Sequence, residues 1–294
     1  MKAIASINFK GGVGKTTVIW LLAKYIADRE KKKILVVDAD AQMSLTLAIS
    51  IEESGGFQGS FGKWYDSYTQ KKETIFNALE QYDLYARGKK RHFDFPIGPA
   101  SVYQLSTNLH FVPSVVDLYW LELEVFDRVA MKDFVRSWLG KLQHSKALPS
   151  YDFVFFDCPP SFSLLSYSVL SSCSLVLMPV NPDVFASRGV GLMVDGMKLH
   201  ISPWPDPAIC VFMNKAGYYA SGYRAGKLQR PTIFYQQEVK RVVDQLRTSG
   251  TNITALDSFI PHRVNIGRAI PGAYFPDDFE DHFRELWNEM QTHL

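Results

Sequence analysis

Glycine, lysine and threonine cluster near the start of the chain, in the segment NFKGGVGKTT. Gly14, Lys15 and Thr16 end a pattern close to G-x-x-x-x-G-K-[ST], in which backbone N–H groups surround phosphates, the lysine reaches the β- and γ-phosphates and the hydroxyl binds Mg²⁺. Phe9 stands where the first glycine of that pattern would be, and a second lysine, Lys10, precedes two further glycines. The segment therefore predicts a nucleotide phosphate site formed by Gly11, Gly12, Val13, Gly14, Lys15, Thr16 and Thr17.

Carboxylates close two apolar segments that we expect to be buried strands. Asp38 and Asp40 end KKILVVDAD, and Asp157 ends YDFVFFD. Alternate residues of a strand point the same way, and ligands bind at the carboxyl ends of parallel strands, so these side chains should lie near the phosphates. Hydrolysis needs a group that positions the attacking water and a group that orients the metal shell. Asp38 and Asp40 suit these two roles, and Asp157 is predicted to hold a metal-bound water opposite Thr16.

Apolar segments alternate with helical patterns along most of the chain. The expected strands are at 2–9, 32–40, 152–160, 174–180 and 208–216. Apolar residues at helical spacing predict helices at 14–30, 163–173 and 188–200. Strands that are apolar throughout and alternate with helices predict an α/β fold, with a mostly parallel twisted sheet covered by helices on both faces.

Residues 51–150 are less regular than the rest of the chain. They contain an aromatic, glycine-bearing segment and the basic run RGKKRH, followed by one long amphipathic helix expected at 117–142. We interpret this stretch as an elaboration inserted between two strands of the sheet. The prediction is therefore a single P-loop domain over residues 1–294.

Composition and charge restrict the possible classes of protein. The chain has 294 residues, of which 47% are hydrophobic and 21% charged, enough for a full globular core. The net charge is only +2, so any binding to nucleic acid must come from a local patch. The three cysteines form no C-x-x-C pair, and no apolar run reaches the roughly 18 residues that span a bilayer. Because the glycine-rich motif leaves no room for a signal peptide before it, we expect a cytoplasmic protein.

The chain resembles the ParA/MinD family of deviant Walker A ATPases in the motifs KGGVGKTT, VVDADAQ and YDFVFFDCPPSFSLLSYSVL, and in SLVLMPVNPDVFASRGV. The match covers residues 1–50 and 151–216. The segment FIPHRVNIGRAI at 259–270 is similar to a late loop of the family on the adenine side. The resemblance implies ATP and Mg²⁺ as cofactors, ATP hydrolysis as the activity and an ATP-dependent homodimer.

The resemblance also implies roles for single residues. Lys10 would cross the dimer interface and contact the phosphates of the partner's nucleotide, where it offsets the repulsion between two facing ATP molecules. Asp40 would position or activate water, and Asp38 would support the metal shell. Asn214 matches a position that recognises adenine, and Pro261 lies near the expected place of the base.

Charge is divided unevenly between the last two segments of the chain. Residues 206–270 hold nine Lys or Arg against four acids, and residues 271–294 hold one Arg against six acids. A basic segment binds DNA phosphates without reading sequence. The predicted contacts to non-specific DNA are Arg224, Lys227, Arg230, Lys240 and Arg241. The tail PDDFEDHFRELWNEMQTHL is amphipathic with an acidic face that anionic lipid repels, so we expect a helix packed on the sheet and no membrane contact.

The chain departs from the family pattern at Cys158 and Ala41, where the family usually has Thr and Pro, and in the long insertion. A motif so early in the chain, with no helix-turn-helix before it, resembles the small ParA type. That type implies a nucleoid-associated switch, which a cargo-bound adaptor protein releases from DNA by stimulating hydrolysis. The insertion and the opening INFKGGVGKTT are most similar to members that position carboxysomes; plasmid or chromosome partition is the rival cargo class.

Three other functions stay open at this point. A MinD-like membrane-cycling ATPase needs a basic amphipathic helix at its end. An ATP-dependent biosynthetic ligase on the same fold needs a substrate pocket with convergent polar groups, which residues 51–150 would have to supply. An electron-transfer ATPase needs cysteines that hold a metal cluster, and the three cysteines here are better explained by packing.

Overall fold

The computed structural model describes residues 1–53, 74–91, 102–219, 226–263, 275 and 277–294. Its centre is a sheet of eight strands in the order β3-β4-β2-β5-β1-β6-β7-β8. All neighbouring strands run parallel except β3 and β4, which are antiparallel. The strands are β1 Lys2–Ser6, β2 Ile34–Asp38, β3 Tyr103–Gln104, β4 Leu109–Val112, β5 Phe153–Asp157, β6 Leu175–Val180, β7 Ala208–Ala216 and β8 Ile253–Pro261.

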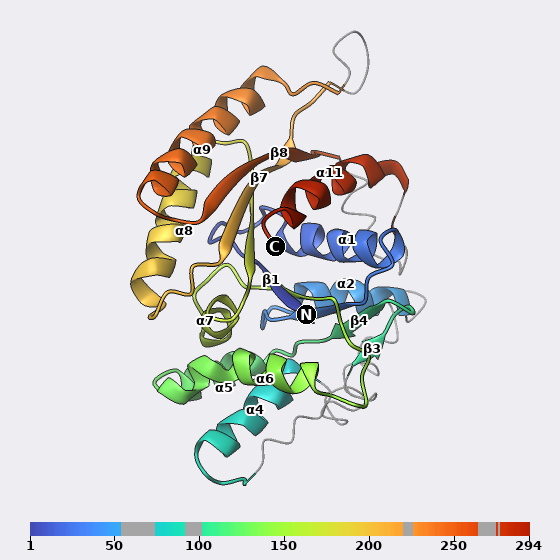
Figure 1. The fold of residues 1–294 in the computed structure, drawn as a ribbon, viewed down its shortest axis with the longest axis vertical. Coiled ribbons are helices and arrows are strands. Elements are labelled where there is room, and N and C mark those ends of the chain that lie inside the picture. Colours follow the sequence, from blue (N-terminus) through green and yellow to red (C-terminus); the bar gives the residue numbers. More distant parts are fainter. Residues whose placement is uncertain (54–73, 92–101, 220–225, 264–274, 276) are drawn as a thin grey trace.

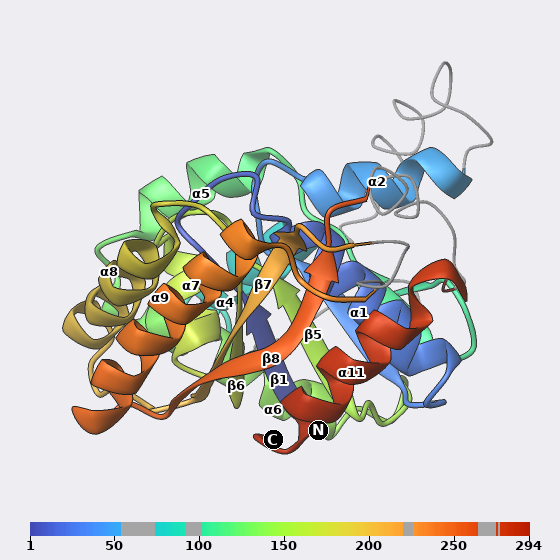
Figure 2. The same cartoon turned by 90° about the horizontal axis from the view of Figure 1, so that it is seen from above.

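Helices cover both faces of the sheet, as the apolar strands predict (Figures 1 and 2). One face packs against α1 Lys15–Asp28, α2 Ser44–Glu53 and α11 Glu280–Gln291. The other face packs against α4 Ile75–Ala86, α5 Asp117–Val125, α6 Phe134–Gln143, α7 Leu164–Leu170, α8 Ala186–His200 and α9 Arg230–Thr248. The predicted fold class, a mostly parallel α/β sheet, is therefore confirmed.

Alternation along the strands explains the two layers. Ile4 and Phe155 pack toward α1 and α11, whereas Ala5 and Phe156, one residue further along, pack toward the helices of the opposite face. Both sets are fully buried, so neither face of the central strands meets solvent. Such strands are apolar throughout and hold the loops at their carboxyl ends in fixed positions.

Residues 102–143 are a more regular part of the fold than the sequence suggested. They supply two strands of the sheet, and β4 pairs with β2 from Ile34↔Leu109 to Val37↔Val112. The single helix expected at 117–142 is wrong: α5 ends at Val125, a 3-10 helix spans Val129–Asp133 and α6 begins at Phe134. The interruption lets both Met131 and Phe134 turn into the core, where they are fully buried.

The end of the chain forms the expected helix on the sheet. Trp287 of α11 stacks edge-on against Phe153 of β5, with ring centroids 5.3 Å apart. Glu289 accepts hydrogen bonds from the backbone N–H groups of Asp257 and Ser258 in β8, at 2.9 and 2.7 Å. Strand β8 was not predicted, since as an edge strand it is only partly buried. In the part of the chain that the structure describes, no helix has the length and apolar character to cross a membrane.

Candidate nucleotide-binding site

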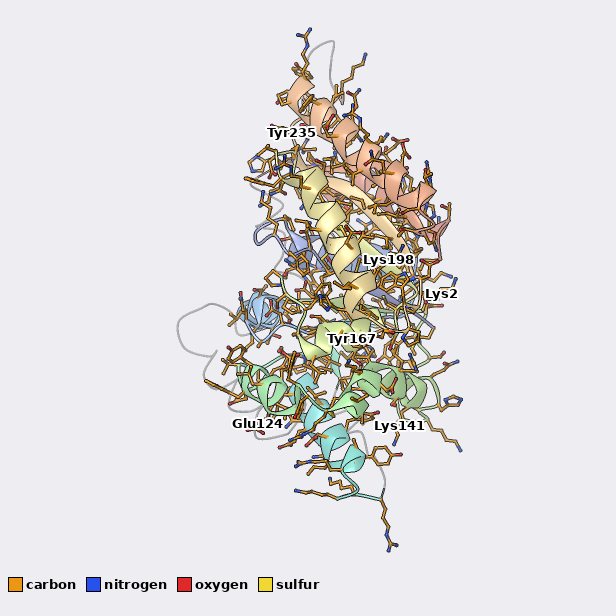
Figure 3. The ribbon with its side chains drawn as sticks, turned by 90° about the vertical axis from the view of Figure 1, so that its left-hand side faces the viewer. Lys2, Glu124, Lys141, Tyr167, Lys198 and Tyr235 are labelled. Atoms are coloured by element: carbon orange, nitrogen blue, oxygen red, sulfur yellow. The ribbon has the colours of Figure 1, made fainter. Side chains whose placement is uncertain are left out.

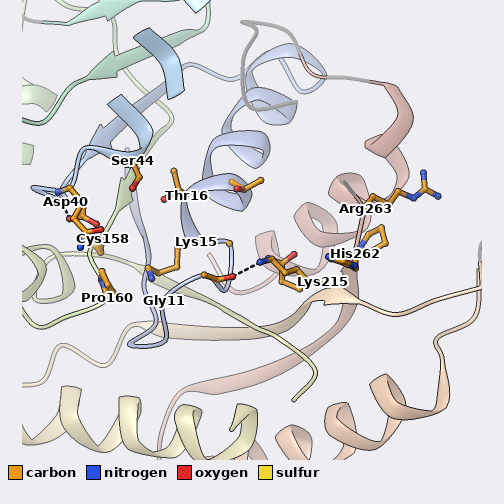
Figure 4. Close-up of a pocket in the computed structure, with 16 residues that line it drawn as sticks. Gly11, Lys15, Thr16, Asp40, Ser44, Cys158, Pro160, Lys215, His262 and Arg263 are labelled. Atoms are coloured by element: carbon orange, nitrogen blue, oxygen red, sulfur yellow. Dashed lines mark hydrogen bonds between the residues drawn. The ribbon is translucent and has the colours of Figure 1, made fainter. Parts of the chain in front are cut away.

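The glycine-rich loop joins β1 to α1 and borders a pocket of about 470 Å³ at the carboxyl end of the sheet. Figure 4 shows Asp40, Cys158 and Pro160 on one side of Lys15 and Thr16, and Lys215, His262 and Arg263 on the other. Most of the residues that we predicted to bind the nucleotide line this pocket: Gly11, Gly12, Gly14, Lys15, Thr16, Thr17, Asn214 and Pro261. The structure thus brings together residues that are more than 240 positions apart in the sequence.

Gly14 is required by both conformation and space. Its φ of 88° lies in the left-handed region, which residues other than glycine rarely adopt. A Cβ at this position would lie 2.3 Å from Nδ2 of Asn214. The loop can therefore approach β7 closely only because this residue has no side chain.

Two side chains at the end of β7 bind the loop directly. Nδ2 of Asn214 donates to the carbonyl oxygen of Val13, and Nζ of Lys215 donates to the carbonyl oxygen of Gly12, both at 2.6 Å. In a trans peptide the C=O and the following N–H point in opposite directions. Hence the N–H groups of Val13 and Gly14 point away from β7, as a phosphate-binding loop needs. Lys215 was missed by the sequence analysis, although it directly follows the predicted Asn214.

Lys15 lies inside the pocket. Its Nζ donates a hydrogen bond to the carbonyl oxygen of Asn8, at 3.1 Å. Burial lowers the pKa of Lys15, and the nearby carboxylates of Asp157 and Asp40 oppose that change. A phosphate that accepts from Nζ would supply the negative charge that this buried ammonium lacks.

Asp157 and Thr16 fit a magnesium site. The Thr16 hydroxyl hydrogen-bonds the Asp157 carboxylate, whose other oxygen, Oδ1, is buried and has no hydrogen-bond partner. Burial, and next the charge of Asp38, raise the pKa of Asp157 well above its usual value. Mg²⁺ takes one or two protein ligands and completes its shell with phosphate oxygens and waters, so the Thr16 hydroxyl and the Asp157 carboxylate are enough protein groups to hold it.

Asp38 is placed differently from its neighbour Asp40. It is fully buried and is not among the residues that line the pocket. One carboxylate oxygen accepts from the Asp40 N–H, and the other accepts from the N–H and hydroxyl of Thr46, at 2.8 and 2.7 Å. Burial raises the pKa of Asp38 to about 7. The carboxylate fixes the segment between β2 and α2, and its role at the metal stays a prediction.

Asp40 is in the position expected for a residue that acts on water. It lines the pocket, and its Oδ1 accepts a hydrogen bond from the Gln42 N–H at 2.9 Å. Burial raises its pKa, while the Gln42 N–H and the charge of Lys15 act in the opposite direction. Asp40 is partly buried rather than enclosed, so it faces the pocket and can also contact water.

Lys10 does not line the pocket formed by its own loop. Its ammonium group forms an ion pair with Asp183 and lies 5.5 Å from the centre of the Phe185 ring. Both residues follow β6, on the outside of the site. The side chain of Lys10 is 42% exposed, so it is open to a second molecule.

The predicted DNA contacts are only partly free of neighbouring acids. Lys240 pairs with Asp257, and Arg241 pairs with Glu238 at 2.8 Å. Lys227 and Arg230 are exposed at the start of α9. Arg224 lies outside the described residues. These roles stay predictions.

A family model described as an AAA domain, AAA_31, matches residues 1–202, and the chain belongs to this family. Among curated proteins it is similar to the chromosome-partitioning ATPase Soj of Treponema pallidum, with 27% identity over 67% of this chain and 64% of that protein. It is also similar to the sporulation initiation inhibitor protein Soj of Bacillus subtilis, with 26% identity over 67% of this chain and 65% of that protein. The matches span 51–64% of the length of the first curated relatives.

Solved structures of similar fold cover nearly the whole chain. They include McdA of Cyanothece in complex with ATP, at 17% identity over 99% of this chain and 96% of that chain, with a TM-score of 0.70. A plasmid partition protein of Borrelia burgdorferi B31 bound to AMPPNP covers 100% and 99%, at 19% identity and a TM-score of 0.65. Cobyrinic acid a,c-diamide synthase of Mycobacterium smegmatis, with an ATP analogue and magnesium, covers 98% and 96% at 20% identity and a TM-score of 0.65. The resemblance to ParA-type ATPases that the motifs indicate is confirmed.

Proposed function

We propose that the protein is a ParA-type ATPase switch. ATP closes a sandwich dimer that binds DNA without sequence preference, and hydrolysis, stimulated by a cargo-bound adaptor protein, opens the dimer and releases the DNA. The observation that carries this proposal is the placement of the two lysines of the glycine-rich loop. Lys15 points into its own pocket, whereas Lys10 points outward to Asp183 and is exposed.

Lys10 does not reach the nucleotide pocket of its own subunit, but in a dimer it can contact the nucleotide of the second copy. An ATP molecule carries about four negative charges, and two of them facing each other repel unless cations lie between. The surroundings of Lys10 favour an interface, because Phe9, Val184 and Phe185 are large apolar side chains with 38%, 63% and 64% of their surface exposed. Dimerisation through Lys10 therefore depends on the nucleotide.

Within each subunit the chain positions the reacting groups. Lys15 and the loop N–H groups hold the β- and γ-phosphates, and Asp40 orients the attacking water. Thr16 and Asp157 would hold Mg²⁺, which would supply positive charge against the phosphates. Asp40 also lines a groove next to the nucleotide pocket, so a partner protein can act on the rate through it.

DNA binding rests on the basic residues of the segment that contains α9. Lys227 and Arg230 are exposed, and the ion pairs of Lys240 and Arg241 lie at the surface, where such pairs are weak and exchange readily for phosphate. A dimer presents this segment twice, which strengthens binding through avidity. The protein is then cytoplasmic and associated with the nucleoid, and its cargo is a plasmid, a chromosomal locus or a carboxysome.

Neither a membrane-cycling ATPase nor a ligase has support of equal weight. The exposed face of α11 carries Asp281 and Glu285, which anionic lipid repels. The similarity to cobyrinic acid a,c-diamide synthase is one of fold. A groove beside Asp40 is lined mainly by apolar side chains, and its other acid, Glu122, already accepts a hydrogen bond from the Leu165 N–H.

The test is binding to non-specific duplex DNA with ATP and with ADP, over a series of salt concentrations. We expect binding that needs ATP and falls steeply with salt. Lys10→Ala should abolish it while the variant still binds ATP. The control is Lys32→Ala, an equally exposed lysine at the opposite end of the sheet. DNA binding that is equal in ATP and ADP, or absent in both, contradicts the proposed switch.

A further inference from the structure

Arg263 connects the nucleotide pocket to a neighbouring tyrosine. Pro261, His262 and Arg263 line the pocket at the end of β8, and we call them the base-side wall because adenine is expected near Pro261. The guanidinium group of Arg263 is directed away from Lys15 (Figure 4) and donates a hydrogen bond to the hydroxyl of Tyr218. Its Cζ lies 5.2 Å from the centroid of the Tyr218 ring. Arg263 thus borders the pocket and holds Tyr218 at the same time.

Tyr218 is fixed to the base-side wall although it does not line the pocket itself. Its ring packs against Phe259 of β8 and His282 of α11, with centroids 6.3 and 6.0 Å apart. The backbone that precedes it is also bonded to the wall, because the carbonyl oxygen of Ala216 accepts from the His262 N–H at 2.9 Å. Both the backbone and the hydroxyl therefore make Tyr218 move with the wall.

The backbone of Tyr218 pairs with the segment that leads into α9. Tyr218 and Leu228 form an antiparallel β-bridge. Beside it, the Tyr219 N–H donates to the carbonyl oxygen of Lys227 at 2.9 Å. Helix α9 begins two residues after Leu228, at Arg230. Two of the predicted DNA contacts, Lys227 and Arg230, thus lie directly beside the residue with which Tyr218 pairs.

This chain of contacts gives the nucleotide a way to prepare the DNA surface. Lys227 and Arg230 are exposed, so ordering the backbone that carries them has an entropy cost when they bind phosphates. A ligand that fixes the same backbone beforehand removes part of that cost, and DNA then binds more tightly through unchanged contacts. Packed side chains and hydrogen bonds that follow one another without a gap are the physical means by which two sites are coupled.

We infer that Arg263 and Tyr218 are positioning residues that link the nucleotide to the DNA-binding segment. A nucleotide whose base lies against the base-side wall holds Arg263 in place and, through Tyr218, fixes Lys227 and Arg230. Because ATP and ADP have the same base, this link depends on whether the pocket is occupied, whereas the proposed dimer depends on the γ-phosphate. The inference rests on the proposed switch, for which it names the residues that connect the pocket to the DNA surface.

The first experiment is hydrogen exchange on the full chain without nucleotide, with ADP and with ATP, always with Mg²⁺. Mass spectrometry follows the backbone N–H groups of residues 226–232. We expect either nucleotide to slow exchange of this segment several-fold in the wild type. Tyr218→Phe keeps the ring and loses the hydroxyl, so most of the slowing should disappear. A merely structural hydroxyl would instead speed exchange by the same factor with and without nucleotide.

DNA affinity at saturating ATP tests the same contact. Tyr218→Phe should keep ATP binding and dimerisation but bind duplex DNA about two- to tenfold more weakly, as expected for one lost hydrogen bond. Arg263→Met should have a similar effect, and the double variant should lose no more than the larger single loss. The control is Tyr167→Phe, whose hydroxyl accepts from the Ser202 N–H at 3.3 Å. Figure 3 shows Tyr167 well apart from Tyr235 of α9.

Four results would overturn the inference. They are no slowing of exchange by nucleotide in the wild type, unchanged slowing in Tyr218→Phe, faster exchange by one factor in all states of that variant, and additive losses of DNA affinity in the double variant. If the wild type binds DNA equally with ATP and ADP, or not at all, the proposed switch fails. Loss of the slowing in Tyr218→Phe would then still support the link between the pocket and the segment before α9.

Discussion

Asp38 and Asp157 occupy paired positions on the neighbouring strands β2 and β5, and both are buried. Burial raises the pKa of both carboxylates, and the charge of Asp38 raises the pKa of Asp157 further. The hydrogen bonds from Thr46 keep Asp38 in place, whereas Oδ1 of Asp157 is left without a partner. The two acids thus have different roles: Asp38 holds the loop after β2, and Asp157 has a free oxygen that can bind a cation.

Replacing Asp38 by Asn should change how stability depends on pH in the absence of ATP and Mg²⁺. The pKa of Asp38 is about 7 in the fold, whereas its ordinary value is 3.8. Between these values the folded chain keeps a proton that the unfolded chain has lost, so the free energy of unfolding falls as pH rises, by up to about 1.4 kcal/mol per pH unit. Asp38→Asn should remove part of this slope in denaturant titrations between pH 4 and 7.

The control for that slope is Asp195→Asn, which changes an exposed carboxylate on α8. It should leave the pH dependence as in the wild type. An unchanged slope in Asp38→Asn would mean that the buried carboxylate is ionised throughout.

Lys15→Ala should lose ATP binding by about a hundredfold or more, because a buried ammonium that contacts two phosphates is removed from a low-dielectric site. Fluorescence titration with a labelled ATP analogue measures the affinity. Melting temperature confirms that the fold is kept. An affinity equal to that of the Lys32→Ala control would refute the phosphate role.

Asp40→Asn should keep ATP binding but lower turnover by about 10²–10⁴-fold, the usual range for loss of a group that orients or deprotonates the nucleophile. The variant should therefore accumulate as the ATP-bound dimer. Phosphate release and light scattering test the two halves of this prediction. Normal turnover would transfer the water-positioning role to another residue.

Asp183→Asn should favour ATP-dependent dimerisation. The ion pair with Asp183 holds Lys10 within its own subunit, and this pair must open before Lys10 can reach the partner's nucleotide. An exposed pair of this kind contributes about 0.2–1 kcal/mol, and a symmetric dimer opens two of them, so their loss should tighten the dimer by about two- to thirtyfold. Sedimentation equilibrium with ATP gives the dissociation constant, and weaker dimerisation would indicate that Asp183 itself belongs to the interface.

Lys215→Met should weaken ATP binding by about tenfold, since a charge-assisted hydrogen bond to the Gly12 carbonyl is lost while the length of the side chain is kept. Lys227→Met, at an exposed lysine outside the pocket, is the control. The loss should be similar for ATP and ADP, because the bond orders the loop and does not contact the γ-phosphate. A loss confined to ATP would contradict this explanation.

The parts of the site that could be predicted are those that a local sequence pattern or the family resemblance marks. Gly14, Lys15 and Thr16 are adjacent, and a strand before them and a helix after them suffice to define their geometry. Asp157 could be predicted because it ends an apolar strand. The position of Asp38 outside the pocket lining could not be predicted. It depends on the hydrogen bonds from Thr46, which no local sequence pattern reveals.

Contacts between distant segments were the least predictable. The bonds from Lys215 to Gly12 and from Lys10 to Asp183 join residues 203 and 173 positions apart. The break between α5 and α6 follows from the burial of Met131 and Phe134, which a helical pattern of apolar residues does not distinguish from one continuous helix. Strand β8 was not predicted because an edge strand has fewer apolar residues than a strand in the middle of the sheet.

Glu289 of α11 occupies two of the backbone N–H donors of β8, the last strand on its side of the sheet. An open edge strand is a template on which a foreign strand can add, and a carboxylate that covers these donors removes that opportunity. Helix α11 therefore disfavours addition of a foreign strand along this stretch of β8. The ATP-dependent association that we propose uses a different part of the fold, the loops at the carboxyl ends of the strands.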